Sequence, residues 1–128
     1  MNKSITVASI QMFLHKEKEK NMDEAEKHLK RISQFFPQVK LAVFPEFSFV
    51  DLNLKMEDQA EKIPGNLTSY FSKLARQYGV WLIPGTMYER VGGDIFNTAP
   101  IFSPKGSLVG KYRKRYPWCP YEKTTPGK

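Results

Sequence analysis

Apolar residues follow two different periods along this chain, and the change of period predicts strands and helices in turn. Residues 5–12 and 39–44 are nearly continuous runs of apolar, small and β-branched side chains, which is typical of strands covered on both faces. Residues 80–85 predict a third strand. Between these runs, apolar residues recur every three or four positions over residues 21–36 and 67–78, as on one face of an amphipathic helix.

Four residues mark the ends of the two predicted helices. Asn21 is a suitable N-cap for the first helix, and Glu24, three residues later, completes a capping box. Pro37 ends this helix, because a proline has no backbone N–H to donate. Gly79 lies where the second helix needs a left-handed residue after its last turn.

The last third of the chain predicts two more strands. Residues 94–102 and 107–114 have the composition of strands, and residues 103–106, with the sequence SPKG, form a turn between them. The full order is then β-α-β-α-β-β-β, without an internal repeat or a low-complexity linker. This order predicts an α/β fold with the helices on one face of a sheet, and 128 residues are enough for one ordinary domain.

Positive charge is concentrated towards the C-terminal end of the sequence. The net charge is +7, and residues 105–128 carry +6 of it through seven lysine and arginine residues and one glutamate. A basic segment of this kind suits nucleic acid, or acidic partners elsewhere in the sequence or in another subunit. Charge alone leaves both possibilities open.

The composition argues against a membrane protein and against a bound metal. The chain has no run of eighteen apolar residues, and its apolar N-terminal stretch lacks the small-residue cleavage site of a signal peptide. Cys119 is the only cysteine, so no internal disulfide can form, which fits a cytoplasmic location. The sequence has no HExxH motif, no Cys/His metal spacing and no glycine-rich phosphate loop, so we expect neither a metal nor an organic cofactor.

Glu46 is the first candidate for chemistry. It directly follows a predicted buried strand, and its neighbours are Phe44, Pro45 and Phe47. A carboxylate among such neighbours loses hydration, which raises its pKa and suits a general base. The alternative is a glutamate at the end of a strand that faces water.

Lys114 and Glu122 form a second candidate pair. Strand alternation puts Lys114 on the face opposite to Arg113 and Arg115. A desolvated lysine paired with a carboxylate can stabilise an oxyanion, whereas a solvated lysine on a strand edge only discourages aggregation. Glu122 follows eight residues later, after a proline-containing loop, and could fold back onto Lys114 or remain an ordinary surface glutamate.

Cys119 has the right element for a nucleophile but unsuitable neighbours. An acyl-transfer nucleophile usually uses the backbone N–H of the next residue as an oxyanion donor, and Pro120 has none. Pro117 indicates an extended segment rather than the helix start that would stabilise a thiolate. We therefore expect Cys119 to lie near a site without acting in it.

Four motifs together resemble the nitrilase superfamily of carbon–nitrogen hydrolases. They are VFPEFS, IFNTAPIF, GKYRK and PWCPYEKTTPG, and they occur in the family's order between residues 5 and 127. The sequence around PWCP is most similar to the aliphatic amidase and formamidase branch. The resemblance implies an α-β-β-α sandwich, of which this chain is the N-terminal part.

The resemblance also implies a reaction and a role for each candidate. Glu46 matches the family's base, Lys114 its oxyanion lysine and Glu122 its supporting glutamate. Trp118 matches an aromatic residue near the amidase pocket. The family uses a cysteine thioester, and the amidase branch would hydrolyse a small amide to a carboxylic acid and ammonia, without metal or cofactor.

One member of the family's catalytic set has no counterpart in residues 1–128. The family's nucleophilic cysteine follows the second glutamate at the end of another strand, which this sequence does not reach. We therefore expect residues 1–128 to be an incomplete carbon–nitrogen hydrolase domain, a truncated fragment without activity of its own. The second sheet of the sandwich would also be absent, so an exposed apolar face should drive association. We expect the full-length family member to be a homo-oligomer.

Two other functions compete with the hydrolase interpretation. The segment KYRKRYPW interleaves cations and aromatic residues, as single-strand nucleic-acid sites do. That interpretation gives no role to the helical faces or to Glu46, so we expect no nucleic-acid partner. A non-catalytic relic that keeps the fold for assembly is the other alternative, and the sequence does not separate it from truncation.

Overall fold

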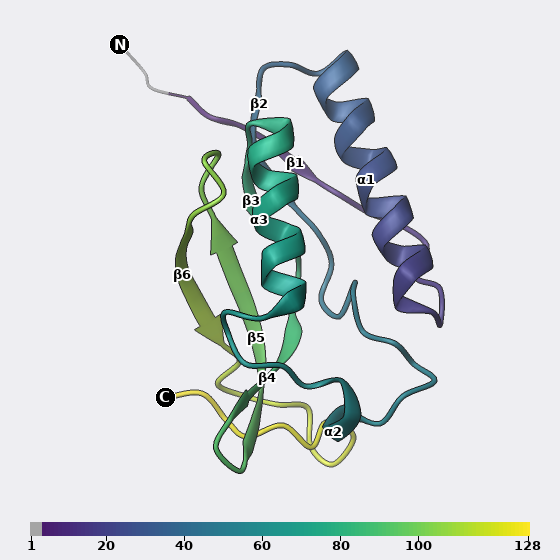
Figure 1. Cartoon of the computed structure of the whole chain (residues 1–128), viewed down its shortest axis with the longest axis vertical. Helices are drawn as coiled ribbons and strands as arrows, with labels where there is room; N and C mark the ends of the chain where they lie inside the picture. Colours follow the sequence, from purple (N-terminus) through teal and green to yellow (C-terminus); the bar gives the residue numbers. More distant parts are fainter. Residues whose placement is uncertain (1–3) are drawn as a thin grey trace.

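Residues 4–128, the part of the chain that the computed structural model describes, form a six-stranded sheet with two long helices on one face (Figure 1). The elements in chain order are β1 (Thr6–Ser9), α1 (Lys18–Phe35), β2 (Val39–Val43), α2 (Met56–Gln59), α3 (Asn66–Tyr78), β3 (Trp81–Ile83), β4 (Met87–Val91), β5 (Asp94–Phe102) and β6 (Leu108–Arg113). None of the helices within these residues has the length and apolarity that a bilayer span requires.

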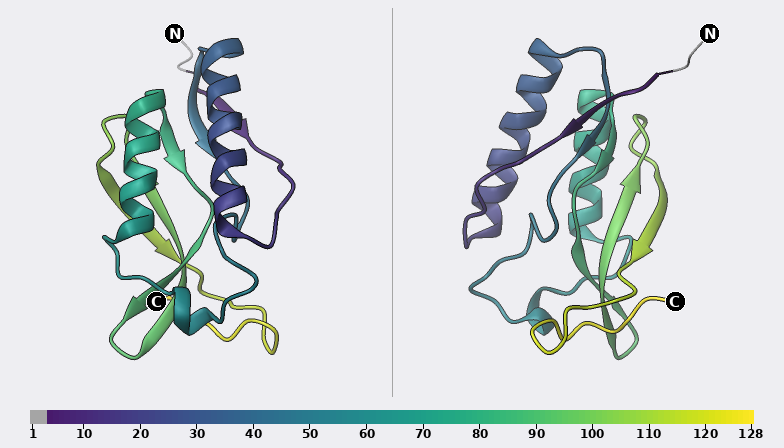
Figure 2. Two further views of the ribbon diagram at one scale, coloured as in Figure 1. Left: turned by 45° about the vertical axis from the view of Figure 1, so that its right-hand side comes forward. Right: turned by 180° about the vertical axis from the view of Figure 1, so that it is seen from behind.

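The sheet is parallel on one side and antiparallel on the other. β1, β2 and β3 run parallel, side by side, and α1 and α3 lie in the connections between them. β3 and β4 lie end to end along one edge of β5, because Leu82 pairs with Phe102 and Met87 pairs with Thr98. β6 pairs antiparallel with the other edge of β5. Figure 2 shows both long helices on the same side of the sheet, which confirms the predicted α/β layering.

The core lies between the two long helices and the face of the sheet that they cover. Leu29 of α1 and Phe71 and Leu74 of α3 are almost fully buried, in one cluster with Ala42 and Phe102 of the sheet. The rings of Phe71 and Phe102 meet edge to face, 6.1 Å apart. Since each buried leucine or phenylalanine stabilises a fold by about 1.5–3 kcal/mol, these contacts hold the helices on the sheet.

The opposite face of the sheet, which we call the open face, keeps apolar side chains exposed. Val7, Leu41 and Trp81 lie side by side across β1, β2 and β3, and Val7 and Trp81 are 47% and 40% exposed. Tyr112 of β6, also exposed, shares this face. Within residues 4–128 the first two strands are therefore covered on one face, and the other face exposes apolar side chains, as expected for a fragment without the second sheet. Their side chains are apolar on both faces, but both long helices pack on the same side.

The helix ends agree only in part with the sequence signals. Gly79 ends α3 with a φ of 63°, in the left-handed region, as predicted. Asn21 is not the N-cap of α1, which begins three residues earlier after Glu17. The buried side chain of Asn21 instead accepts a hydrogen bond from the backbone N–H of His15 and donates one to its carbonyl oxygen. Asn21 therefore fastens the preceding loop to the helix.

Two elements have no counterpart among the predicted ones. The short helix α2 lies in the long connection between β2 and α3. The strand β4 pairs with β5 through a hairpin whose turn is Gly92–Gly93. Gly92 has a φ of 58°, which suits a two-residue hairpin turn.

Candidate active site

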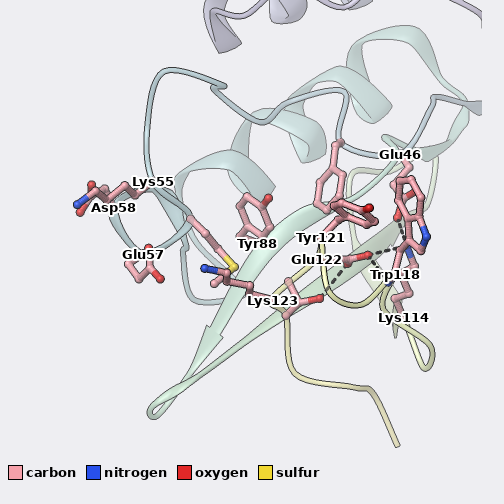
Figure 3. Close-up of a pocket in the computed structure, with 13 residues that line it drawn as sticks. Glu46, Lys55, Glu57, Asp58, Tyr88, Lys114, Trp118, Tyr121, Glu122 and Lys123 are labelled. Carbon is pink, nitrogen blue, oxygen red and sulfur yellow. Dashed lines mark hydrogen bonds and ion pairs between the residues drawn. The ribbon is translucent and has the colours of Figure 1, made fainter.

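Three charged side chains, which Figure 3 labels as Glu46, Lys114 and Glu122, meet beside the open face together with the amide of Asn97. Lys114, directly after β6, lies between two carboxylates, with its Nζ 3.0 Å from Oε1 of Glu46 and 2.8 Å from Oε2 of Glu122. Asn97 of β5 donates from Nδ2 to Oε1 of Glu46 at 2.7 Å and to Oε1 of Glu122 at 2.8 Å. We call these four residues the open cluster. Glu46, Lys114 and Glu122 thus lie together, as the sequence motifs indicated.

A tight turn after β2 determines where Glu46 points. Phe47 has a φ of 57°, in the left-handed region, and its N–H donates to the hydroxyl of Thr86 at 3.0 Å. Gly85 packs directly on the carbonyl group of Pro45, because a Cβ at residue 85 would lie 1.8 Å from that oxygen. The segment after β3 therefore holds the turn in place, and only a glycine fits at residue 85.

The carboxylate of Glu46 is more hydrated than its apolar neighbours in the sequence indicated. Its side chain is 49% exposed. Phe44 and Phe49 turn into the core, where their rings pack against each other, and Phe47 packs against Tyr88. The expected loss of hydration is therefore not present within residues 4–128, because these rings pack on other aromatic side chains and leave half of the Glu46 side chain exposed.

Lys114 is held by its backbone as well as by its side chain. Its N–H donates to the carbonyl oxygen of Asn97 at 2.8 Å, and its own carbonyl oxygen accepts from the N–H of Gly127 at 2.8 Å. Hydrogen bonds to Glu122 first, and to Glu46 second, raise the pKa of the ammonium above its ordinary value. Lys114 is therefore a fixed positive charge at neutral pH.

Glu122 accepts more hydrogen bonds than any other member of the open cluster. Besides Lys114 and Asn97, the hydroxyl of Thr124 donates to it at 2.8 Å and the backbone N–H of Trp118 at 3.1 Å. Burial alone would raise the pKa of this carboxyl, but these hydrogen bonds outweigh burial and lower it to about 2. Glu122 is thus ionised at neutral pH and suited to holding Lys114 in place.

Asn97 and Thr124 are site residues that sequence reasoning did not select. Asn97 is 1% exposed, and its Oδ1 has no hydrogen-bond partner among residues 4–128. Its one signal was a polar side chain inside the otherwise apolar motif IFNTAPIF. Thr124 gave no such signal, because it lies in a polar segment.

A cavity of about 900 Å³ opens beside the cluster, between α2 and the C-terminal loop. Glu46, Lys114 and Glu122 line one end of it (Figure 3). Its walls include four aromatic side chains, which are Phe47, Tyr88, Trp118 and Tyr121. Trp118 is 70% exposed, and its ring stacks at a tilt on that of Tyr121, 4.9 Å away. Lys55, Glu57, Asp58 and Lys123 also line the cavity. This combination of charged groups and aromatic walls suits a small polar molecule with an apolar part.

Cys119 lies beside the cavity rather than in it. It is exposed and is not among the residues that line the cavity. Its Sγ is 3.9 Å from the backbone carbonyl oxygen of Glu122, and within residues 4–128 no hydrogen bond joins it to Glu46 or Lys114. In the same described part of the chain, no group of three or more His, Cys, Asp or Glu side chains is placed to hold a metal ion.

A second charged group lies on the other face of the same strands. Glu89 of β4, with a side chain only 1% exposed, receives two hydrogen bonds from Arg113, at 2.8 and 2.9 Å, one from Thr98 at 2.8 Å and one from Lys111. We call these four residues the closed cluster. Burial would raise the pKa of Glu89, but its hydrogen bonds outweigh burial and lower it to about 2. The guanidinium of Arg113 also lies over the ring of Phe96, 4.3 Å from its centre.

The two clusters together account for the basic segment. Lys111 and Arg113 pair with Glu89, and Lys114 pairs with Glu46 and Glu122. Three of the four cations in KYRKR are therefore engaged by carboxylates of this chain. This arrangement does not favour the nucleic-acid interpretation, which needs these cations for phosphate groups.

Comparisons with known proteins agree with these motifs. The sequence model described as "Carbon-nitrogen hydrolase" matches residues 6–128. A formamidase from Bacillus cereus (strain B4264) is 36% identical over 91 residues, which are 68% of this chain and 27% of that protein. The omega-amidase NIT2 of Xenopus tropicalis is 33% identical over 106 residues, 82% of this chain and 38% of that protein.

Solved structures share the fold. Nit3 of Saccharomyces cerevisiae, a member of branch 10 of the nitrilase superfamily, superposes with a TM-score of 0.83 at 25% identity, over 97% of this chain and 49% of that one. A carbon-nitrogen hydrolase from Helicobacter pylori G27 gives a TM-score of 0.79 at 26% identity, over 97% and 45%. The chain thus spans about half the length of these structures, and less of the curated relatives. With this fold and a family match that covers nearly all of its residues, the chain belongs to the carbon-nitrogen hydrolase family.

Proposed function

We propose that this chain is the N-terminal part of an amidase-type hydrolase that converts a small amide to a carboxylic acid and ammonia. The observation that carries the proposal is the position of Lys114, held between the carboxylates of Glu46 and Glu122 at one end of a cavity. A fixed ammonium beside a partly hydrated carboxylate provides both a charge for a developing oxyanion and an acceptor for a proton.

The roles follow from the contacts of each side chain. Glu46, half exposed to the cavity, is the general base. Lys114 stabilises the oxyanion of the tetrahedral intermediate, and Glu122 holds Lys114 and balances its charge. Trp118 forms part of the wall against which the substrate lies.

In the proposed reaction a cysteine thiol gives its proton to Glu46, and the thiolate attacks the amide carbon. The C–N bond then breaks, and the leaving nitrogen departs as ammonia with that proton. Water, deprotonated by Glu46, attacks the thioester and releases the acid and the thiol. Cys119 is poorly placed for this step, so we propose that the nucleophile comes from sequence outside residues 1–128, that these residues are an incomplete domain, and that they are inactive alone.

The choice of an amide, rather than a nitrile, rests on the similarity to proteins named formamidase and omega-amidase. A cytoplasmic location and a homo-oligomeric full-length protein complete the proposal. The presence of a single cysteine in residues 1–128 supports the cytoplasmic location. The exposed apolar side chains of the open face support association.

A chimera tests the proposal directly. Residues 1–128 would replace the structurally equivalent part of the Helicobacter pylori carbon-nitrogen hydrolase, and ammonia release would be measured with a panel of small amides that includes formamide. We expect turnover that falls by at least about a thousandfold in Glu46→Gln and Lys114→Met, but not in Glu24→Gln and Lys27→Met, which alter an exposed pair on α1.

Two results would contradict the proposal. The first is a folded chimera whose turnover survives both Glu46→Gln and Lys114→Met. The second is amide hydrolysis by the isolated chain that persists after Cys119→Ala, since it would show that residues 1–128 need no further nucleophile.

A further inference from the structure

Asn97 contacts every charged member of the open cluster. Its Nδ2 donates to Glu46 at 2.7 Å and to Glu122 at 2.8 Å, and its backbone carbonyl oxygen accepts from the N–H of Lys114 at 2.8 Å. The residue is 1% exposed and lies in β5, which is paired along both edges. Asn97 is therefore a rigid point to which all three proposed functional groups are attached.

The chemistry of the amide suits a position between two anions. A primary amide nitrogen carries two protons, and here each proton goes to a different carboxylate. The opposite orientation would put the amide oxygen against both carboxylates and leave no donor between them. The unpartnered Oδ1 is consistent with this orientation, because the side chain is held by its two donors rather than by its acceptor.

Both donors that reach Glu46 bind the same carboxylate oxygen. Asn97 at 2.7 Å and Lys114 at 3.0 Å converge on Oε1, whereas Oε2 accepts no hydrogen bond from residues 4–128. The side chain is half exposed and lines the cavity. One oxygen of Glu46 is thus anchored, and the other is available to a molecule in the cavity.

We propose that Asn97 is a positioning residue that anchors Oε1 of Glu46 and leaves Oε2 as the oxygen that accepts the proton. This inference rests on the proposed function, which assigns Glu46 as the base. Without Asn97, the carboxylate of Glu46 keeps only its hydrogen bond to Lys114. The side chain can then rotate into solvent, which breaks this hydrogen bond and leaves Lys114 paired with Glu122 alone.

Thr98 provides a matched control for a purely structural role. It is the next residue of β5, is also buried, and donates a hydrogen bond to a carboxylate, but it belongs to the closed cluster on the other face. Asn97→Leu keeps the volume of the side chain and removes its donors, and Thr98→Val does the same on the opposite face. If Asn97 only supports the strand, the two substitutions should affect the open cluster alike.

The test measures how fast Lys114 is acetylated, by mass spectrometry at low protein concentration, relative to the exposed Lys105 in the same chain. We expect Asn97→Leu to raise the relative rate of Lys114 several-fold, because the ammonium loses Glu46 as a partner, and Thr98→Val to leave it unchanged. Equal rates in the unsubstituted protein and Asn97→Leu would overturn the inference, and so would an equal rise in Thr98→Val.

A second measurement needs no substitution and therefore does not depend on the stability of a variant. In the unsubstituted protein the two Nδ2 protons of Asn97 should give separate resonances that exchange with solvent far more slowly than those of the exposed Gln38. Fast, averaged protons would show that the amide is not held by both carboxylates. Neither experiment uses an amide substrate, so failure of this inference is distinguishable from failure of the proposed hydrolysis.

Discussion

The two faces of the sheet carry charged clusters built from neighbouring residues of the same strands, but the clusters differ in how completely they are enclosed. In β5, Asn97 belongs to the open cluster and Thr98 to the closed one. At the end of β6, Arg113 belongs to the closed cluster, and Lys114, the next residue, belongs to the open one. In the closed cluster the side chain of Glu89 is 1% exposed, whereas in the open cluster that of Glu46 is 49% exposed.

This difference separates a stabilising function from a chemical one. Both oxygens of Glu89 are occupied by donors from Lys111, Arg113 and Thr98, so the carboxylate has no free position for a ligand. In the open cluster one ammonium serves two carboxylates, and part of Glu46 faces a cavity. A satisfied, enclosed ion pair fixes the strands, and a partly exposed one next to it can take part in a reaction.

The largest expected effect is the loss of stability when the enclosed carboxylate is removed. Glu89→Ala should lower the free energy of unfolding by about 3 kcal/mol, because it leaves two cations without their partner. The value lies at the low end for buried pairs, since Lys111 and Arg113 are about one third exposed and can turn to water. Glu46→Ala should cost about 0–1 kcal/mol, as for an exposed ion pair.

Denaturant unfolding of both variants at one protein concentration measures this contrast. Glu89→Gln is the control that keeps the shape of the side chain and should fall between the unsubstituted protein and Glu89→Ala. Equal losses from Glu89→Ala and Glu46→Ala would show that the two clusters do not differ in the way proposed.

Acid should weaken both clusters in the same pH range. The pKa values of Glu89 and Glu122 are about 2 in the folded chain, against 4.5 when unperturbed. A lowered carboxyl pKa adds stability that is fully present above 4.5 and is lost as the pH falls from about 4.5 to about 2. Stability measured across this range should therefore decline steeply in the unsubstituted protein.

Substitutions then assign the acid sensitivity to each face. Glu89→Gln and Glu122→Gln should each flatten the decline, and Glu89→Gln should do so more, because its carboxyl is the more deeply buried of the two. A decline that remains equally steep in the double variant would place the acid-sensitive groups elsewhere in the chain.

The open face itself should make the isolated chain associate. Trp81 is 40% exposed beside Leu41 and Val7, so two copies can bury apolar surface against each other. Trp81→Glu should raise the dissociation constant by at least about tenfold, which corresponds to about 1.4 kcal/mol. Phe13→Glu, which removes a more exposed aromatic side chain outside the sheet, should change it little.

Sedimentation of the unsubstituted chain, Trp81→Glu and Phe13→Glu over a range of concentrations measures the dissociation constant of each. If the unsubstituted chain stays monomeric at every concentration, the open face does not cause association. Association that persists equally in Trp81→Glu and Phe13→Glu would place the contact on another surface.

Local sequence signals were enough for the elements whose stability is local. α3 has an apolar stripe and a glycine stop, and it begins and ends within one residue of the predicted range. β4 was not predicted, because Glu89 places a charge at a buried position of that strand. Its partners Lys111 and Arg113 lie 22 and 24 residues further along the chain, where no short-range periodicity can show them.

The same limit applies to the open cluster. Glu46 and Lys114 were identifiable because Glu46 follows a predicted strand, Lys114 ends another, and each belongs to a recognisable motif. Asn97 was not, because its role depends on two carboxylates 51 and 25 residues away. Hydration of Glu46 was also misjudged, since the sequence shows which aromatic residues are near but not which way their rings point.

The smallest expected effect on stability belongs to Trp118. Its ring is 70% exposed, and its hydrogen bonds to the open cluster within residues 4–128 come from its backbone: the N–H donates to the carboxylate of Glu122, and the carbonyl oxygen accepts from the N–H of Glu122. Both remain after substitution. Trp118→Ala should therefore change the free energy of unfolding by less than about 0.5 kcal/mol and leave the acetylation of Lys114 unchanged. In the active chimera it should instead raise KM for the amide with little change in kcat, because the ring forms a wall of the cavity and has no titratable group. A fall in kcat with KM constant would mean that Trp118 orients Glu122 or Lys114, and would extend the open cluster to its aromatic wall.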